Sequence, residues 1–186
     1  MAKTLLFLVL VLLIILYVQY YTKYNNDYKI IQSTLGNLEG KVLYERYPIV
    51  ISDRLVNPDD ILKTLFKYTY LTEKRAVIEG SFNVCRVFNK YTIIYSPHED
   101  IDMNLIVPSY SKEFAPWHMH TSECMFVSKG HSLTDSNAQY ITIKLKKQQV
   151  LILPPYWMYH SINIYRIIAL NDPISSLINF RNVWST

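Results

Sequence analysis

Histidine is the residue type in this chain best suited to metal chemistry, and three of the five histidines lie in two short segments. One residue separates His118 from His120, so on a β-strand their imidazoles point to the same face. Glu123 follows this pair, and His160 comes later, after an apolar run and a Pro-Pro turn. Two or three imidazoles and one carboxylate from neighbouring strands suit Fe, Mn, Ni or Zn. The spacing therefore predicts a metal site formed by His118, His120, Glu123 and His160.

A second interpretation of these residues involves no ligand. The histidine pair is flanked by Phe114, Pro116 and Trp117, which also fits an exposed loop, and His160 beside Ser161 also fits a hydrogen-bonded histidine at the rim of the fold. Other catalytic patterns are missing from the sequence. There is no G-x-S-x-G, and the four glycines form no Gly-rich loop for a phosphate. We therefore assign no catalytic residue, and no cofactor beyond the metal.

The elements that must position the histidines are mainly β-strands. The run YITIKL alternates between apolar and polar residues, as a half-buried strand does. Similar short segments, rich in β-branched and aromatic residues, are separated by turn-forming residues. The predicted strands are Val84–Phe88, Tyr91–Tyr95, Met103–Val107, Glu123–Val127, Tyr140–Leu145, Val150–Leu153, His160–Leu170 and Ser175–Phe180. About eight strands at this spacing predict a β-sandwich or barrel.

One helix is predicted in the part of the chain that follows the first forty residues. Asn57 is a good capping residue, Pro58 suits the first helical position, and Asp59 and Asp60 favour the positive end of the helix dipole. An apolar face then continues to about Tyr70. The sequence thus predicts a mainly β domain that carries one short helix near its start.

The N-terminal segment has the composition of a membrane-spanning helix. Residues 5–18 read LLFLVLVLLIILYV, and the 19 residues from Thr4 to Thr22 carry no formal charge. As a helix these residues are about 28 Å long, close to the hydrocarbon thickness of a bilayer. A buried helix of a soluble protein is rarely apolar on every face. A cleaved signal peptide would end in small residues, which VQYYTKYNN does not provide.

These features divide the chain into three parts. Residues 1–22 are predicted as a transmembrane anchor, residues 23–40 as a polar stalk and residues 41–186 as the β domain. Lys23, Lys29 and Lys41 follow the anchor, whereas Lys3 precedes it. The positive-inside rule therefore favours a single-pass protein whose soluble domain faces the cytosol.

Composition excludes some classes of partner. The net charge is +4, and Lys144, Lys146 and Lys147 form the one dense basic spot. A nucleic-acid-binding surface needs a stripe of positive charge, so we predict no nucleic-acid partner. Cys85 and Cys124 are too few for a disulfide framework, and one bridge or two buried thiols both remain open.

The motifs resemble those of the cupin superfamily, the double-stranded β-helix shared with Jumonji-C and other 2-oxoglutarate-dependent dioxygenases. The first cupin motif, His-x-His, three or four residues, Glu, six residues, Gly, is similar to His118, His120, Glu123 and Gly130. The stretch LPPYWMYH, which ends at His160, resembles the Pro-x-x-Trp-x-His turn of Jumonji-C-like proteins with one extra residue. The resemblance covers about residues 45–185. It implies a cupin-like jelly roll and a divalent transition metal held by the two histidine segments.

The sequence departs from the family pattern in several places. Only two residues separate His120 from Glu123, which on a strand turns the acid to the opposite face unless a bulge intervenes. Cys124 stands at the usual spacing. The second cupin motif is Gly, five residues, Pro-x-Gly, two residues, His, three residues, Asn. Its two glycines are replaced here by Gln149 and Trp157, and its Asn by Ile164. No arginine or lysine is assignable to a 2-oxoglutarate cosubstrate.

Two functional hypotheses follow. The first is a membrane-anchored structural or interaction protein built on a degenerate cupin-like barrel. Its composition, rich in Ile, Tyr, Asn and Lys, makes it similar to cupin-like proteins of large nucleocytoplasmic DNA viruses. That resemblance implies a place in the virion membrane, with the lipid bilayer and capsid or other membrane proteins as partners. The alternative is a metal-dependent oxygenase or isomerase tethered to a membrane.

Overall fold

The computed structural model describes residues 2–53, 57–67, 70–120 and 125–184. Three α-helices and twelve β-strands make up these ranges, with four short 3-10 helices between them. The α-helices are α1 (Ala2–Thr22), α2 (Pro58–Leu65) and α3 (Pro173–Trp184). The strands are β1 (Ile31–Ser33), β2 (Ile49–Ile51), β3 (Thr72–Ile78), β4 (Asn83–Arg86), β5 (Tyr91–Tyr95), β6 (Ile101–Ile106), β7 (Trp117–His120), β8 (Met125–Ser132), β9 (Ile141–Leu145), β10 (Val150–Leu153), β11 (Met158–His160) and β12 (Tyr165–Asn171).

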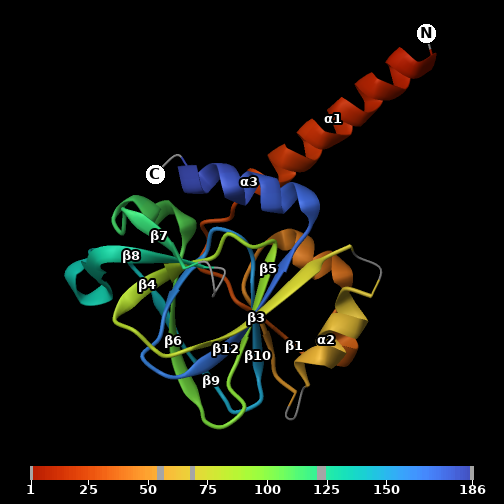
Figure 1. Ribbon diagram of the computed structural model, residues 1–186. Helices are drawn as coiled ribbons and strands as arrows, with labels where there is room; N and C mark the ends of the chain where they lie inside the picture. Colours follow the sequence, from red (N-terminus) through yellow and green to blue (C-terminus); the bar gives the residue numbers. More distant parts are fainter. Residues whose placement is uncertain (1, 54–56, 68–69, 121–124, 185–186) are drawn as a thin grey trace.

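The strands form two six-stranded sheets that pack face to face (Figure 1). Sheet A has the order β1-β2-β10-β5-β12-β3, and sheet B has the order β7-β8-β4-β11-β6-β9. Four strands of each sheet, β3-β12-β5-β10 and β4-β11-β6-β9, alternate along the chain as a double-stranded β-helix does. The predicted jelly roll is therefore confirmed. The β7–β8 hairpin lies outside these eight strands, at the free side of β4.

Side-chain alternation along the strands produces three apolar layers. On β6, Ile101, Met103 and Leu105 are fully buried between the sheets, whereas Asp102 is exposed. This central layer also contains Trp157 and residues from both sheets. The outer face of sheet A is covered by Ile61 and its neighbours in and around α2. The outer face of sheet B is covered by a separate cluster that includes Tyr21 at the end of α1.

The predicted helix at Asn57 is confirmed. The side chain of Asn57 accepts a hydrogen bond from the backbone N–H of Asp59 at 3.1 Å, and Pro58 occupies the first helical position. The helix ends at Leu65, earlier than the predicted end near Tyr70. Its buried residue, Ile61, joins the layer outside sheet A.

Three predicted segments differ from the structure. Residues 175–180 were expected as a strand but belong to α3, because Asp172 and Ser175 cap the helix by exchanging backbone-to-side-chain hydrogen bonds of 2.7 and 2.9 Å. Residues 160–170 were expected as one strand but are split between β11 and β12. Within the expected stalk, Ile31–Ser33 form β1 and pair in parallel with β2.

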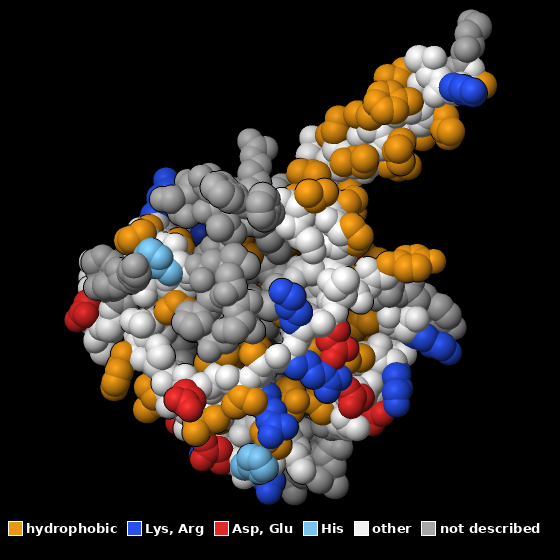
Figure 2. Space-filling view, in the orientation of Figure 1, with side chains coloured by type: hydrophobic (Ala, Val, Ile, Leu, Met, Phe, Trp, Pro, Cys, Tyr) orange, Lys and Arg blue, Asp and Glu red, His pale blue; other side chains and the backbone are white. Residues whose placement is uncertain are grey.

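Helix α1 projects from the domain (Figure 1). Hydrophobic side chains cover its projecting part (Figure 2), and Leu6, Leu10 and Leu13 are 72%, 54% and 58% exposed. In contrast, Tyr21 in its last turn is 1% exposed. This one helix among the described residues is long and apolar enough to span a membrane. It is therefore free along most of its length and packed into the domain at its C-terminal end.

The loop at Gly80 provides a test of the packing between strands. A Cβ on Gly80 would lie 2.0 Å from the backbone carbon and oxygen of Ile162, and the neighbouring Ser81 donates its N–H to the Ser161 carbonyl at 3.1 Å. We expect Gly80→Ala to lower the free energy of unfolding by about 2 kcal/mol, because backbone atoms must separate. Gly36→Ala is the control, since nothing lies within 4 Å of its added Cβ. Urea unfolding in a neutral detergent checks this prediction, and equal stability of the two variants would contradict it.

Candidate functional site

The strand register decides which histidines can meet, because directly paired residues on neighbouring strands point to the same face of a sheet. His118 on β7 pairs with Val127 on β8, and Val127 pairs with Cys85 on β4. Cys85 in turn pairs with Tyr159 on β11. Cys85 and Tyr159 are buried in the layer between the sheets, so His118 lies on the inward face of sheet B. As part of the edge strand β7, His118 is itself exposed.

His160 lies on the opposite face of the same sheet. It is the next residue after the inward-facing Tyr159, and it pairs with Asn104, which pairs with Thr142. Asn104 Nδ2 lies 3.3 Å from His160 Nδ1, and Thr142 donates to Asn104 Oδ1 at 2.7 Å. Burial lowers the pKa of His160, because the charged imidazolium loses hydration. His160 is thus a neutral histidine in a polar row on the outer face.

Two of the four predicted ligands, His118 and His160, are therefore separated by the sheet in this register. The described residues hold no group of three His, Cys, Asp or Glu side chains that could bind a metal ion. The backbone of His120 belongs to β7. Glu123 and Cys124 lie outside the described residues. A metal held by His118, His120 and Glu123 without His160 stays a prediction.

The space between the sheets is filled by large side chains. Trp157, Tyr159 and Tyr165 are each at most 2% exposed, and the rings of Tyr159 and Tyr165 meet edge to face at 5.9 Å between centroids. Trp157, which replaces a glycine of the cupin pattern, is thus a core residue. Burial raises the pKa of Tyr165 well above its ordinary value. An interior packed with aromatic and aliphatic groups provides apolar support for the sheets instead of polar ligands for a substrate.

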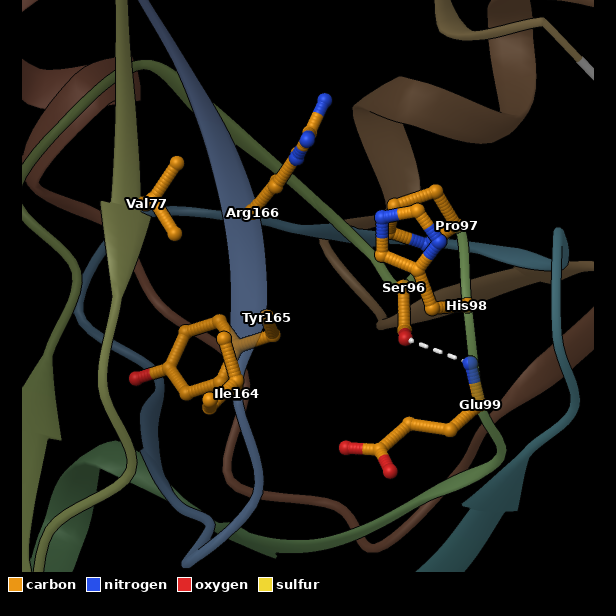
Figure 3. A pocket seen from close by; sticks show the side chains of 8 residues that line it. All are labelled: Val77, Ser96, Pro97, His98, Glu99, Ile164, Tyr165 and Arg166. Carbon is orange, nitrogen blue, oxygen red and sulfur yellow. Dashed lines mark hydrogen bonds between the residues drawn. The ribbon is translucent and has the colours of Figure 1, made fainter.

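A surface pocket of about 360 Å³ lies on the outer face of sheet A, beside the loop between β5 and β6. Figure 3 shows Arg166 and His98 pointing in directions different from that of Glu99, whose backbone N–H donates to Ser96 Oγ at 3.3 Å. The side chains of Arg166, His98 and Glu99 are all exposed. These groups do not converge on a common ligand position, so the pocket has no evident reactive centre.

The junction between α1 and the domain is the most elaborate arrangement of polar groups in the described part of the chain. The Tyr21 hydroxyl donates to the Phe88 carbonyl, and Arg46 Nη1 donates to the Tyr21 carbonyl at 3.0 Å. Tyr17 donates to Asp172, which also forms an ion pair with Lys90 at 2.7 Å. Helix α1, the loop before β2, the loop after β4 and the start of α3 are thereby joined.

Asp172 is held ionised by this junction. Burial alone would raise the pKa of its carboxyl group, but the hydrogen bonds from Lys90, Ser175 and Tyr17 outweigh burial and lower the pKa below its usual value. The same carboxylate caps α3 through the backbone N–H of Ser175. Asp172 therefore links the base of α1 to the helix that closes the chain.

Comparisons with known proteins assign the chain to no family. No protein-family model matches the chain, and no curated protein matches it. Among solved structures, hydroquinone 1,2-dioxygenase from Sphingomonas sp. TTNP3 with 4-hydroxybenzoate bound is 12% identical, with a TM-score of 0.36 over 58% of this chain and 63% of that chain. RmlC from Streptococcus suis in complex with dTDP-D-xylose is 8% identical, with a TM-score of 0.31 over 67% of this chain and 61% of that chain. The strand order described above independently makes this a cupin-like jelly roll.

Metal analysis tests what remains of the predicted site. We expect His160→Ala to leave the Fe, Mn, Ni or Zn content of the full chain, purified in neutral detergent, unchanged, because the register separates His160 from His118. His118→Ala, measured beside it, tests the remaining ligands. One metal ion per wild-type chain that is lost in His160→Ala would contradict the prediction and support the four-ligand site.

Proposed function

We propose that this protein is a membrane-anchored structural or interaction protein, in which a jelly roll is held rigidly at the bilayer surface by α1. The observation that carries the proposal is the division of α1 into an exposed apolar part and a docked base. Leu10 is 54% exposed, whereas Tyr21 is 1% exposed and lies in the cluster outside sheet B. An apolar helix that the domain does not cover needs an apolar environment, which a bilayer supplies.

The docked base also argues against a cleaved leader. The Tyr21 ring packs edge to face against Tyr156 at 6.0 Å, and Tyr156 packs in the same way against Phe88 at 5.8 Å. Removal of α1 would expose Tyr156 and Phe88 and would leave Arg46 without the carbonyl that it contacts. A segment that completes a buried cluster is expected to remain in the mature protein.

Within this proposal, the domain acts through its position and its outer surfaces. The interior is occupied by side chains such as Trp157 and Tyr159, both at most 1% exposed, so a partner must bind from outside. The finer proposal is an inner-membrane or capsid-associated protein of a large DNA virus, with capsid or other membrane proteins as partners. Composition and the resemblance of the sequence support this finer proposal. The lysines that follow α1 support the proposal that the domain lies on the cytosolic side.

Membrane insertion is tested by charge placement along α1. We expect the wild-type chain to resist alkaline carbonate extraction and to have a mass that includes residues 1–22. The double variant Leu10→Arg/Leu13→Arg should be extracted, because two arginines in the bilayer centre cost about 6 kcal/mol. The matched control Gln19→Arg/Thr22→Arg adds the same charge near the docked end and should remain in the membrane. Extraction of the wild type, or a mass without α1, would overturn the proposal.

The docking of α1 is tested by truncating its buried tyrosine. We expect Tyr21→Ala to lower the free energy of unfolding of the whole domain by about 3 kcal/mol, because a large side chain leaves a packed cluster. Gln19→Ala, two residues away on an exposed position of the same turn, should change it by less than about 0.5 kcal/mol. Urea unfolding in neutral detergent measures both. Equal stabilities would show that α1 is a tether without a structural contact.

A further inference from the structure

A pocket of about 320 Å³ lies where α1 enters the domain. It is lined by residues at and just after the end of α1 and by residues before β2: Tyr20, Lys23, Tyr24, Asn25, Tyr44, Glu45 and Arg46. The three tyrosine rings are 37%, 49% and 66% exposed in chain order, so the pocket opens at the foot of the projecting helix. It is a polar recess with an aromatic rim.

Arg46 is the buried group of this pocket. Its side chain is 9% exposed, and its guanidinium carbon lies 4.4 Å from the centroid of the Tyr20 ring. Nη1 donates to the Tyr21 carbonyl, but Nε has no acceptor within the described ranges. No acidic side chain among those residues forms an ion pair with this guanidinium. A buried arginine without a counterion is costly unless an anion from outside the protein compensates its charge.

The acids near the junction are already engaged, which leaves positive charge in excess. Glu45 lies 3.7 Å from Lys29, and Asp172 is bound to Lys90. Lys23 is exposed at the rim and has no acidic partner in the described part of the chain.

A second buried guanidinium lies under the same junction. Arg86 lies 4.6 Å from the Phe88 ring and 5.7 Å from the Tyr156 ring, and its Nε also has no acceptor among the described residues. Burial lowers the pKa of Arg86, while the nearby Tyr156 and Tyr24 raise it. Tyr24 lines the pocket and packs edge to face on Tyr156 at 6.1 Å, so Arg86 lies directly behind the pocket wall. Two buried guanidinium groups thus lie close to one pocket.

The position of this pocket along α1 sets its depth in a bilayer. The apolar residues of α1 from Leu5 to Leu16 are largely exposed, and the pocket begins at Tyr20, about one turn further along the helix. In the membrane location proposed above, with the exposed part in the hydrocarbon core, the pocket therefore lies in the head-group region. Exposed tyrosines such as Tyr20 and Tyr24 favour that depth. The anions present there are lipid phosphates.

We propose that the pocket formed by Tyr20, Lys23, Tyr24, Tyr44 and Arg46 binds the phosphate of an anionic phospholipid head group. Arg46 supplies planar N–H donors suited to phosphate oxygens, and Lys23 supplies a mobile charge at the rim. This inference rests on the membrane location proposed above. It adds a choice of lipid, and anionic lipids are enriched in the cytoplasmic leaflet that the lysines after α1 favour.

The binding is tested on the full chain in neutral detergent, so that it does not depend on insertion. Dioctanoyl phosphatidylglycerol, dioctanoyl phosphatidylcholine and inorganic phosphate are added separately, and thermal unfolding is followed. We expect phosphatidylglycerol to raise the Tm, and phosphatidylcholine and inorganic phosphate at the same concentrations to leave it unchanged. Lys23→Gln should weaken the apparent affinity roughly fivefold, as expected for one surface charge. Lys63→Gln, an exposed site on α2, is the matched control and should not weaken it.

Arg46→Gln should abolish the shift in Tm. If Arg46→Gln unfolds because it loses the contact with the Tyr21 carbonyl, the comparison of Lys23→Gln with Lys63→Gln still tests the site. The lipid site would be overturned if phosphatidylglycerol gave no shift in Tm, or if Lys23→Gln and Lys63→Gln weakened the apparent affinity equally. Resistance to carbonate extraction would in that case still support the anchor. An equal shift with inorganic phosphate would show a free-phosphate site and overturn the lipid assignment. A lipid shift in a chain that carbonate extracts would contradict the anchor alone.

Discussion

The burial of Tyr21 is the contact on which the rest of the arrangement depends. Its ring completes the apolar cluster outside sheet B, its hydroxyl binds the Phe88 carbonyl, and its own carbonyl accepts from Arg46. A residue of the apolar helix is thus part of the domain core. For this reason α1 is packed against the domain and is not joined to it only by a flexible linker. The direction of α1 relative to the jelly roll is therefore set by contacts within the domain.

The sequence predicted the jelly roll well, because most of its strands show apolar alternation or are β-branched runs with clear turns. It failed where that signal is weak or misleading. Strand β3, Thr72–Ile78, is an edge strand with mostly exposed side chains, so it carries no alternation that marks it as a strand. Helix α3 was mistaken for a strand, although Asp172-Pro173 repeats the cap-and-proline signal of Asn57-Pro58. Capping residues were the better indicator there than β-branched content.

The candidate site shows a different limit. Spacing along one strand predicts a face, and the backbones of His118 and His120 do lie on one strand, β7. Spacing cannot relate two strands that are distant in sequence, because a shift of one residue in any intervening pair reverses the face. Three successive pairings separate His118 from the β11 strand, and they put Tyr159, not His160, in its row. The pocket at Arg46 was likewise beyond sequence reasoning, since its residues come from the end of α1 and from a loop that only the fold brings together.

Polar groups are distributed unevenly in this domain. Between the sheets, Trp157, Tyr159 and Tyr165 are each at most 2% exposed. At the junction with α1, by contrast, Arg46 and Arg86 are kept partly or wholly buried without acidic partners among the described residues. Buried charge of this kind lowers the stability of an isolated domain, and an external anion that binds to it offsets this loss. Among the described residues, three buried side-chain nitrogens lack a hydrogen-bond partner: Trp157 Nε1 lies in the core between the sheets, whereas Nε of Arg46 and Nε of Arg86 both lie at the base of α1. Two buried guanidinium groups beside one surface pocket are the arrangement on which the proposed anion site depends.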